Sequence, residues 1–462
     1  MDSVDELLRL TAGYAARFHA TLDERPVRAS ATFDEVRAAL GGPLPERGSA
    51  PSQVVSDLIA AAEPGVVGSQ TGRYFGFVIG SALPASLAAD WLATTWDQNG
   101  FSVVTSPAAA AAEEVAAGWL AELLGLPDGV ASGFVTGGQG ANTTAIAAAR
   151  QHLLALADWN VAEEGLNGAP HIRVFAGGER HVTIDRSLRL LGIGTNALTV
   201  VSADDEGRMR ADALRDALAD GAGPTIVCAQ AGNVNSGAFD PLAEIADACG
   251  EAGAWLHVDG AFGLWAAASP RFRHLVEGSE RADSWATDAH KWLNVPYDSG
   301  LVFCRHPQAQ ADAMAVAASY LQRGGGRSPS DWVPESSRRA RGFAVWAAVR
   351  ALGRSGTANL VERCCDHASA FAALLAVDPE VEILNEVVLN QVLVRFGADD
   401  ELTREVVRRV QEDGTCWLGA TEWQGRAAMR ISVSSWRTTE ADVERSVAAI
   451  LEAAAAVSGA LR

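Results

Sequence analysis

The sequence predicts an α/β protein with a mainly parallel seven-stranded sheet, helices on both faces, and a smaller α+β domain at the C-terminus. Between residues 132 and 305, seven short β-rich runs alternate with helical segments, which is typical of a parallel sheet with helical crossovers. A polar segment rich in Gly, Ser and Pro, residues 321–337, ends this alternation and is predicted to be a mobile loop. The length of 462 residues leaves room for a further domain beyond it.

The first part of the chain is predicted to be helical. Apolar residues recur at helical spacing in residues 2–18, and another helix is expected over 52–62, after a Pro/Gly/Ser linker at 41–52. The pattern of residues 87–124 is also mostly helical, with an interruption at 100–107. These helices precede every predicted strand.

The predicted sheet follows. Its strands are expected near residues 132–135, 173–176, 197–201, 225–229, 254–258, 284–287 and 300–305. Helices are expected at 142–156, 187–191, 210–220 and 241–252. A helix at 341–352 leads into the C-terminal domain, which has strands near 381–384, 388–396 and 427–433 and helices near 402–412 and 440–457.

Composition and charge argue against several classes of protein. With 57 acidic and 37 basic residues the net charge is −20, whereas nucleic acids and anionic membranes need a basic surface. The N-terminus lacks the basic start and apolar core of a signal peptide, and the uncharged stretches fall short of the roughly 20 apolar residues of a membrane helix. The six cysteines form no C-x-x-C pair, which indicates reduced thiols. We therefore expect a soluble cytoplasmic protein without nucleic-acid or membrane partners.

The chain contains a single lysine, Lys291, among 37 basic residues. In an Ala- and Arg-rich sequence, a surviving lysine indicates a position where arginine cannot serve. Only lysine can lose its proton and act as a nucleophilic amine. The alternative is that Lys291 lies on a solvated surface by chance.

Two segments place ionisable groups at predicted strand ends. In TDAHKWLNVPYDSG, residues 287–300, Lys291 and His290 follow a short strand, and Trp292 can desolvate the amine so that it forms an imine with an aldehyde cofactor. In AWLHVDGAFG, residues 254–263, Asp259 ends an apolar strand, where α/β proteins bind ligands. A carboxylate there can keep a pyridine nitrogen protonated, although it can also cap a turn. His257 fits a hydrogen-bonded core histidine better than a catalyst.

Two further segments have weaker signals. GFVTGGQGANTTAIAAAR, residues 133–150, leads from a strand through a glycine turn into a helix, a cradle suited to phosphate but also a common local motif. It is not a Walker A motif, because it contains no lysine. His181 follows another Gly-containing turn and could stack on a planar cofactor, but a surface or helix-capping role is equally open from the residues alone.

Together these segments resemble the group II decarboxylases that depend on pyridoxal 5′-phosphate (PLP), a family that includes aromatic-L-amino-acid, tyrosine, glutamate and diaminobutyrate decarboxylases. The resemblance extends from about residue 70 to near the C-terminus. Its matching segments are FSVVTSPAAAAAEEVAAGWLAELLGLP, VTGGQGANTTAIAAAR, HVTIDRSLRLLGIG, GNVNSGAFDPLAEIADACGEAGAWLHVDGAFG, PRFRHLVEGSERADSWATDAHKWLNVPYDSG and MRISVSSWRTTEADV. The spacing of the HVD and HKW segments is its most specific feature.

The resemblance implies a type I PLP-dependent transferase fold and a homodimer with shared active sites. It implies an N-terminal helical segment on the partner subunit (1–85), a PLP-binding domain (86–345) and a small domain (346–462). Lys291 would be the Schiff-base lysine, Asp259 the partner of the pyridinium nitrogen, and His181 a stacking residue that faces the substrate. The other implied cofactor contacts are Gly137, Gly138, Gln139, Asn233, Ala261, Asp288 and His290. The implied substrate contacts, some of them from the partner subunit, are Phe77, Ile79, Asn99 and Phe101.

The function implied is decarboxylation of an L-amino acid to an amine and CO2, with an aromatic substrate favoured by Phe77 and Phe101. Many members of the family carry a catalytic tyrosine in the mobile loop, but residues 321–337 contain none, and Tyr320 only borders them. Related enzymes without this tyrosine can be aldehyde synthases, which is therefore an alternative. An aminotransferase, with Arg430 binding the substrate carboxylate, is another. A PLP-binding protein without catalysis is the least favoured, because no DNA-binding segment accompanies it.

Overall fold

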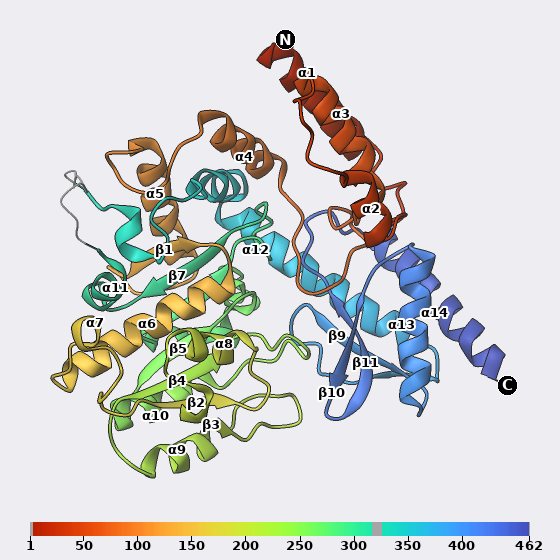
Figure 1. Cartoon of the computed structure of the whole chain (residues 1–462). Coiled ribbons are helices and arrows are strands. Elements are labelled where there is room, and N and C mark those ends of the chain that lie inside the picture. The colour runs from red at the N-terminus through yellow and green to blue at the C-terminus, as the bar shows by residue number, and fades with distance from the viewer. Residues whose placement is uncertain (1–2, 317–325, 462) are drawn as a thin grey trace.

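A seven-stranded sheet forms the centre of the larger lobe in the computed structural model, which describes residues 3–316 and 326–461 (Figure 1). Its strands are β1 (Ala131–Val135), β2 (Arg173–Gly177), β3 (Leu198–Val201), β4 (Thr225–Gln230), β5 (Trp255–Asp259), β6 (Ser284–Asp288) and β7 (Gly300–Cys304). They are ordered β1-β7-β6-β5-β4-β2-β3. Only β7 is antiparallel to its neighbours. The predicted mainly parallel sheet is therefore confirmed.

Helices cover both faces of this sheet, so most of its strands are buried along their whole length. Every residue of β1, β5, β6 and β7 is buried, as expected for strands between two helical layers. One face packs against α6 (Gly138–Leu156), with α8 (Thr183–Leu190), α7 (Val161–Glu164) and α11 (Pro307–Met314) beside it. The other face is covered by α9 (Ala211–Ala219) and α10 (Leu242–Ala252).

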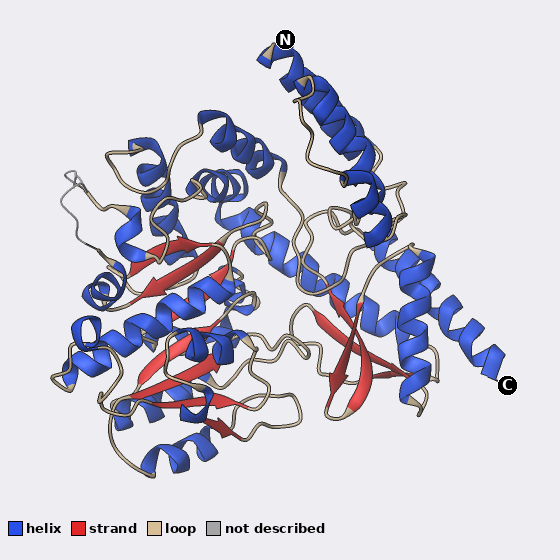
Figure 2. Ribbon diagram, in the orientation of Figure 1, coloured by secondary structure: helices blue, strands red, loops and turns tan. Residues whose placement is uncertain are grey.

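A smaller lobe follows the sheet in sequence (Figure 2). Its antiparallel sheet has the order β10-β11-β9-β8, and its elements are β8 (Val381–Ile383), β9 (Gln391–Phe396), α13 (Asp400–Asp413), β10 (Gly419–Trp423), β11 (Arg426–Ser432) and α14 (Glu440–Leu461). The sequence analysis missed β10. It is joined to β11 by a two-residue turn, Gln424 and Gly425, in which both residues have positive φ, as type I′ hairpins require.

The long helix α12 (Gly342–Leu375) links the two lobes. It contacts α4 (Pro84–Trp96) and α5 (Pro107–Leu123) of the large lobe and α14 of the small one. The predicted helix 341–352 corresponds to its first segment, because Gly353, with φ of 60° and ψ of −173°, breaks the helical geometry there; the second segment, which continues to Leu375, was not predicted.

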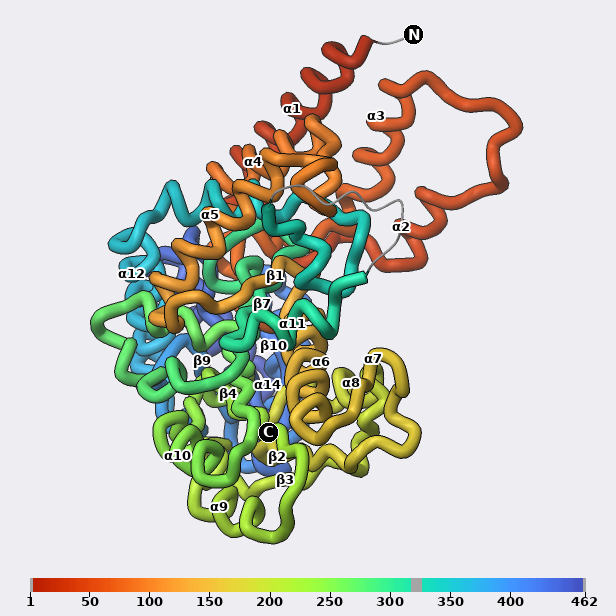
Figure 3. Tube along the Cα trace, turned by 90° about the vertical axis from the view of Figure 1, so that its left-hand side faces the viewer, coloured from red at the N-terminus to blue at the C-terminus, as the bar shows by residue number. Residues whose placement is uncertain are grey.

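The N-terminal helices lie apart from both sheets. These helices are α1 (Val4–Ala20), α2 (Phe33–Leu40) and α3 (Pro51–Ala62), and none has a buried residue. Figures 1 and 3, which differ by a quarter turn, both show α1 and α3 projecting beyond the rest of the chain. Capping boxes at Ser3 and Thr32 start α1 and α2, so local sequence alone defines these helix ends. No helix in the described ranges is long and apolar enough to cross a bilayer.

The segment predicted to be mobile is anchored where it is described. Tyr320 and residues 321–325 lie outside the described residues. Further along, Ser330 N–H donates to the carbonyl of Phe101 at 3.0 Å, and the Arg338 guanidinium forms a buried ion pair with Glu113. Residues 326–337 are thus a loop with hydrogen bonds to β1, through Arg327 and Ser132, and to the segment before α5, through Ser330 and Phe101.

Candidate active site

The four chemistry-bearing segments of the sequence meet at one edge of the large sheet. Asp259 and Asp288 are the last residues of the parallel strands β5 and β6. Strand β1 runs in the same direction as β6, since both are antiparallel to β7, and its glycine turn therefore opens at the same edge. This is the edge at which parallel α/β sheets bind ligands.

The glycine turn leaves no room for side chains. Gly137 precedes α6 and makes no side-chain cap, so the first amides of the helix are directed toward this edge. A Cβ on Gly138 would lie 2.9 Å from Asp288 Oδ2, and one on Gly137 would lie 3.0 Å from the His290 ring. The Cβ of Ala261 is the next neighbour of Gly138, at 3.7 Å. The turn, Ala261 and the residues after β6 therefore form one wall.

Lys291 lies beside a buried carboxylate. Its Nζ is 3.1 Å from Asp288 Oδ2, and the Asp288 side chain is only 2% exposed. His290 Nε2 lies 3.5 Å from the other oxygen, while its Nδ1 accepts a hydrogen bond from Ser299 N–H at 3.1 Å. Burial lowers the pKa of His290, opposed by the charge of Asp288. The single lysine thus points into the site and not into bulk solvent, with 21% of its side chain exposed.

Asn294 fixes the loop that carries Lys291. It has a positive φ of 55°, and its side chain donates to the carbonyls of Trp292 (2.8 Å) and Ser434 (3.0 Å). Its Oδ1 accepts hydrogen bonds from the amides of Ser81 and Trp436. One asparagine therefore joins the lysine loop to the segment before α4 and to the small lobe.

Asp259 is held by two donors. Asn142 Nδ2 donates to Oδ2 at 2.9 Å, and the backbone N–H of Ala261 donates to Oδ1 at 3.2 Å. The Asp259 residue is 5% exposed. The sequence analysis missed Asn142, because a polar residue in the first turn of α6 carries no signal that it faces a strand end. His257, on the same strand as Asp259, is fully buried, and both of its ring nitrogens are hydrogen-bonded.

His181 faces the same space from the loop before α8. Burial lowers its pKa, and the charges that act on it are those of Asp259, Lys291, Arg430 and Asp288. Arg430, on β11, is itself desolvated, which lowers its pKa to about 10. Its Nη1 donates to the carbonyl of Val234 at 3.2 Å, but no acidic side chain in the described residues pairs with it. A histidine and a buried cation without a carboxylate partner are therefore near enough to the site for their charges to interact.

Two predicted cofactor contacts have other side-chain partners here. Gln139 Nε2 donates to Ser187 Oγ at 3.0 Å and to Thr143 Oγ1, so its side chain points toward α8 and only its backbone belongs to the glycine turn. Asn233 Oδ1 accepts from the amides of Asn235 and Ser236, a turn interaction, and its Nδ2 donates to the carbonyl of Glu179. The side chains of both residues are committed to shaping the loops around the site.

The predicted substrate contacts fall into two groups. Phe77 is 58% exposed and stacks on Trp417, and Ile79 lies next to Gly80, whose amide donates to the carbonyl of His290 at 3.3 Å. By contrast, the described hydrogen bonds of Asn99 and of the Phe101 backbone are with residues 330–338. The structure therefore brings the first pair close to the lysine loop and leaves the second pair on a different surface of the chain.

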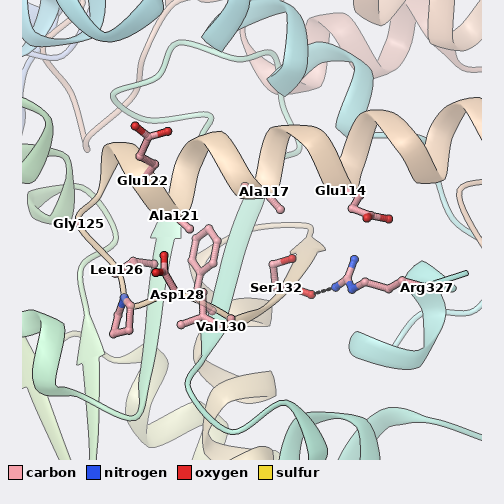
Figure 4. A pocket seen from close by; sticks show the side chains of 14 residues that line it. Glu114, Ala117, Ala121, Glu122, Gly125, Leu126, Asp128, Val130, Ser132 and Arg327 are labelled. Carbon is pink, nitrogen blue, oxygen red and sulfur yellow. Dashed lines mark hydrogen bonds between the residues drawn. The ribbon is translucent and has the colours of Figure 1, made fainter.

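A separate cavity lies between α5, the turn after it and Arg327 (Figure 4). Its volume is about 630 Å³. Glu114, Glu122 and Asp128 line it, and the Arg327 guanidinium donates to the carbonyl of Ser132. None of the residues of the Lys291 site contributes to this cavity. Among the described residues no His, Cys, Asp and Glu side chains cluster as a metal site would require.

The arrangement defines a cofactor-dependent α/β enzyme, and comparison with known proteins gives its family. The model of the pyridoxal-dependent decarboxylase conserved domain matches residues 35–397, more than half of the chain. The chain belongs to this family: it is a carboxy-lyase, and its cofactor is pyridoxal 5′-phosphate.

Individual relatives are similar over nearly the whole length. The chain is 28% identical to 4-hydroxyphenylacetaldehyde synthase of Rhodiola rosea, with 94% of this chain and 92% of that protein covered. It is also 28% identical to aromatic-L-amino-acid decarboxylase of Bacillus atrophaeus, covering 90% and 88%. The fold matches the crystal structure of Oryza sativa TDC with PLP and tryptamine at a TM-score of 0.91, with 23% identity and 98% of both chains covered.

The residues present fit this cofactor. A phosphate needs backbone N–H groups with close access, which the uncapped start of α6 and its two glycines supply. The aldehyde needs an amine, and the described site contains the single lysine of the chain. The pyridine nitrogen needs a carboxylate, and Asp259 is buried at the adjacent strand end. The Asp288 carboxylate opposes a phosphate, but the Lys291 ammonium beside it offsets its charge.

Proposed function

We propose that the protein decarboxylates an aromatic L-amino acid to the corresponding amine and CO2, with Lys291 as the residue that binds the cofactor covalently. The observation that carries this proposal is the position of the one lysine, 3.1 Å from buried Asp288 and against the glycine turn. Similarity to aromatic-L-amino-acid and tyrosine decarboxylases supports the aromatic substrate.

Each side of the site then has a task. Gly137, Gly138 and the backbone of Gln139 bind the phosphate, with His290 and Asp288 beside them and Ala261 against the ring. When bound, the cofactor supplies an electron sink for the pair of electrons released with CO2. Asp259 holds the proton on the ring nitrogen, and its two fixed donors keep its oxygens in place before any substrate arrives.

Binding of the substrate carboxylate falls to Arg430. It is the buried cation without a carboxylate partner among the described residues around the site, and its charge acts on His181. Arg73, the other arginine near the pocket segments, is 2% exposed, and its guanidinium donates to the carbonyls of Asp23 (3.0 Å) and Arg25 (3.1 Å). Since Arg73 is committed to these contacts, no described cation favours an acidic substrate side chain, which supports an aromatic one.

The enzyme functions as a homodimer with shared sites. Support comes from the N-terminal helices, which carry large exposed apolar side chains such as Phe33 (77%) and Leu58 (55%) with nothing of their own chain to cover them. In this assembly residues 1–85 pack on the partner, although residues 71–76 are already buried within their own chain. Asn99 and Phe101 then serve the partner's site. The free, buried cysteines agree with a reducing cytoplasm.

A second candidate is oxidative decarboxylation to an aldehyde. The observation in its favour is the sequence of residues 321–337, which has no tyrosine to protonate the carbon after CO2 leaves. Similarity to 4-hydroxyphenylacetaldehyde synthase points the same way. An aminotransferase would also use Arg430, but it would require a keto-acid acceptor.

The test is to incubate the full-length protein with PLP and single amino acids and to measure CO2, amine, ammonia and peroxide. CO2 and amine in equal amounts, from tyrosine, tryptophan or phenylalanine, would support the main proposal. Ammonia and peroxide with the CO2 would establish the aldehyde synthase instead. Release of no CO2 from any amino acid, with transfer of the amino group to a keto acid, would overturn both.

A further inference from the structure

A chain of hydrogen bonds runs along one face of β5, from Trp255 at the start of the strand to Asp259 at its end, with a branch to His181. Its centre is the Asn142 amide, which is 1% exposed. Asn142 Nδ2 donates to Asp259 Oδ2 at 2.9 Å and to Thr183 Oγ1 at 3.0 Å, using both of its protons. Its Oδ1 lies 2.9 Å from His257 Nε2. The proposed function uses Asn142 only as a donor to Asp259, and it assigns no role to Thr183 or to the bonds that lead to His181.

The direction of these bonds follows from the carboxylate. Ionised Asp259 only accepts hydrogen bonds, so the amide group of Asn142 must face it and the carbonyl oxygen must face His257. His257 Nε2 therefore carries the proton. Burial lowers the pKa of His257 to about 4, so the ring is neutral and Nδ1 is an acceptor.

The bonds at the other end of the hydrogen-bond chain have the same direction. Ser284 Oγ lies 2.9 Å from His257 Nδ1 and accepts a hydrogen bond from Trp255 Nε1 at 2.9 Å. Since the indole can only donate, the one hydroxyl proton of Ser284 is free to reach Nδ1. Trp255, an obligate donor, and Asp259, an obligate acceptor, thus orient every bond between them in the same direction, an arrangement in which each bond polarises the next.

The branch through Thr183 fixes the second histidine. Because Thr183 Oγ1 accepts from Asn142, its own proton is available to His181 Nδ1, 3.0 Å away. The backbone N–H of Thr183 also donates to Nδ1, at 3.4 Å. With two donors directed at it, Nδ1 is an acceptor, and in the neutral ring the proton resides on Nε2.

We propose that Asn142 and Thr183 are positioning residues that hold His181 as the Nε2–H tautomer, so that in the resting enzyme this nitrogen faces the substrate as a donor and not as a base. The use of this tautomer in catalysis rests on the proposed function. In that function, His181 Nε2–H and Arg430 together stabilise the substrate carboxylate before CO2 leaves, and Nε2–H can then return a proton to the substrate. The tautomer itself is a property of the protein alone.

The test is the ¹⁵N NMR spectrum of ring-labelled histidine in the full-length protein, recorded without PLP and again with it. The His181 signals are identified by their loss in His181→Gln. We expect a pyridine-like Nδ1 and a pyrrole-like Nε2. In Thr183→Val, which removes the hydroxyl but keeps the shape, the ratio of Nε2–H to Nδ1–H should fall about fivefold, the effect of one lost hydrogen bond. Thr183→Ser should restore it.

Thr144→Val is the matched control. Thr144 is buried in α6, and its hydroxyl donates to the carbonyl of Gly140 and not to any residue of the hydrogen-bond chain. If Thr183→Val does not fold, Thr183→Ala, which also removes the hydroxyl, provides the same comparison. A proton on Nδ1 in the wild-type protein, or equal shifts in Thr183→Val and Thr183→Ser, would overturn the inference. If His181 is the Nδ1–H tautomer and the protein still decarboxylates its substrate, only this inference is wrong. If His181 is the Nε2–H tautomer and no CO2 is released, only the proposed function is wrong.

Discussion

The N-terminal helices and the large sheet differ in how far their residues are buried within the chain. In α1, α2 and α3 no residue is buried, although Phe33 and Leu58 are large and apolar. In β5 and β6 every residue is buried, including the two aspartates of the site. The sheet is thus complete within one chain, whereas the N-terminal helices expose a surface typical of an interface.

The difference has a functional meaning. The proposed site needs rigid support, and Asp259 and Asp288 have it from strands packed on both faces. The N-terminal helices are proposed to need only a partner subunit. Substitutions in the sheet are therefore expected to affect chemistry or folding, and substitutions in the helices to affect assembly.

The largest expected effect is at Lys291. Replacing it with alanine removes the amine that we propose binds the cofactor covalently, and Lys291→Arg keeps the charge without the nucleophile. Both variants should lose about 10⁴-fold or more in kcat/KM, as expected when a group in covalent catalysis is removed, with unchanged oligomeric state. The absorbance of bound PLP should change in parallel, and an unaltered spectrum would refute the role of Lys291.

The buried ion pair of the large lobe comes next. Arg338 Nη2 lies 2.7 Å from Glu113 Oε1, and both residues are nearly inaccessible. Glu113→Gln should lower the free energy of unfolding by about 3–5 kcal/mol, because it leaves an uncompensated buried charge. Unfolding in urea measures this loss of free energy. Exposed Glu114→Gln, one position along α5, is the matched control and should leave the midpoint unchanged.

Acid should destabilise the sheet through His257. Its folded pKa of about 4 lies below the unfolded value of about 6.5, so between these values the unfolded state binds more protons. This contribution to stability is present above pH 6.5 and is lost as the pH falls toward 4, by about 3 kcal/mol in total. Unfolding curves at several pH values should show a shallower dependence in His257→Gln than in exposed His171→Gln. If stability depends equally on pH in both variants, His257 is not the cause of the acid destabilisation.

Substitutions in the N-terminal helices should weaken dimer formation and not the folding of the single chain. Phe33→Ser with Leu58→Ser should weaken the dimer by about tenfold or more per side chain, since each loses its apolar burial against the partner. Sedimentation equilibrium measures the dissociation constant. Val377→Ser, at an equally exposed position outside these helices (79%), is the control. An unchanged dissociation constant would mean that these helices do not form the interface.

The smallest effect is expected for an ion pair on the surface of α1. Arg9 and Asp5 form a pair at 3.1 Å, with side chains 80% and 70% exposed. Solvent and salt screen such pairs. Asp5→Asn should therefore leave the melting temperature unchanged within error in differential scanning calorimetry. A clear drop would show that α1 is more buried in the assembly than in the single chain.

Several features of the site could be predicted from the sequence because they depend on local signals. The lysine is unique, Asp259 ends an apolar strand, and the glycines precede a helix. Asn142 and Thr183 could not be found, since a polar residue in a helix has no pattern that reveals its neighbours. Likewise residues 326–337 are typical of a loop in sequence, and only the tertiary structure shows their hydrogen bonds to Phe101 and Ser132.

The sequence by itself determined the alternation of strands and helices, the place of the single amine in the chain, and the helix ends marked by capping boxes. These depend on residue type and spacing over a few positions. Only the tertiary structure decided that α6, β5 and α8 bring Asn142, His257 and Thr183 together, and that Arg430 of the small lobe is near enough for its charge to lower the pKa of His181. Such contacts join residues more than 40 positions apart, which periodicity over a few residues does not encode.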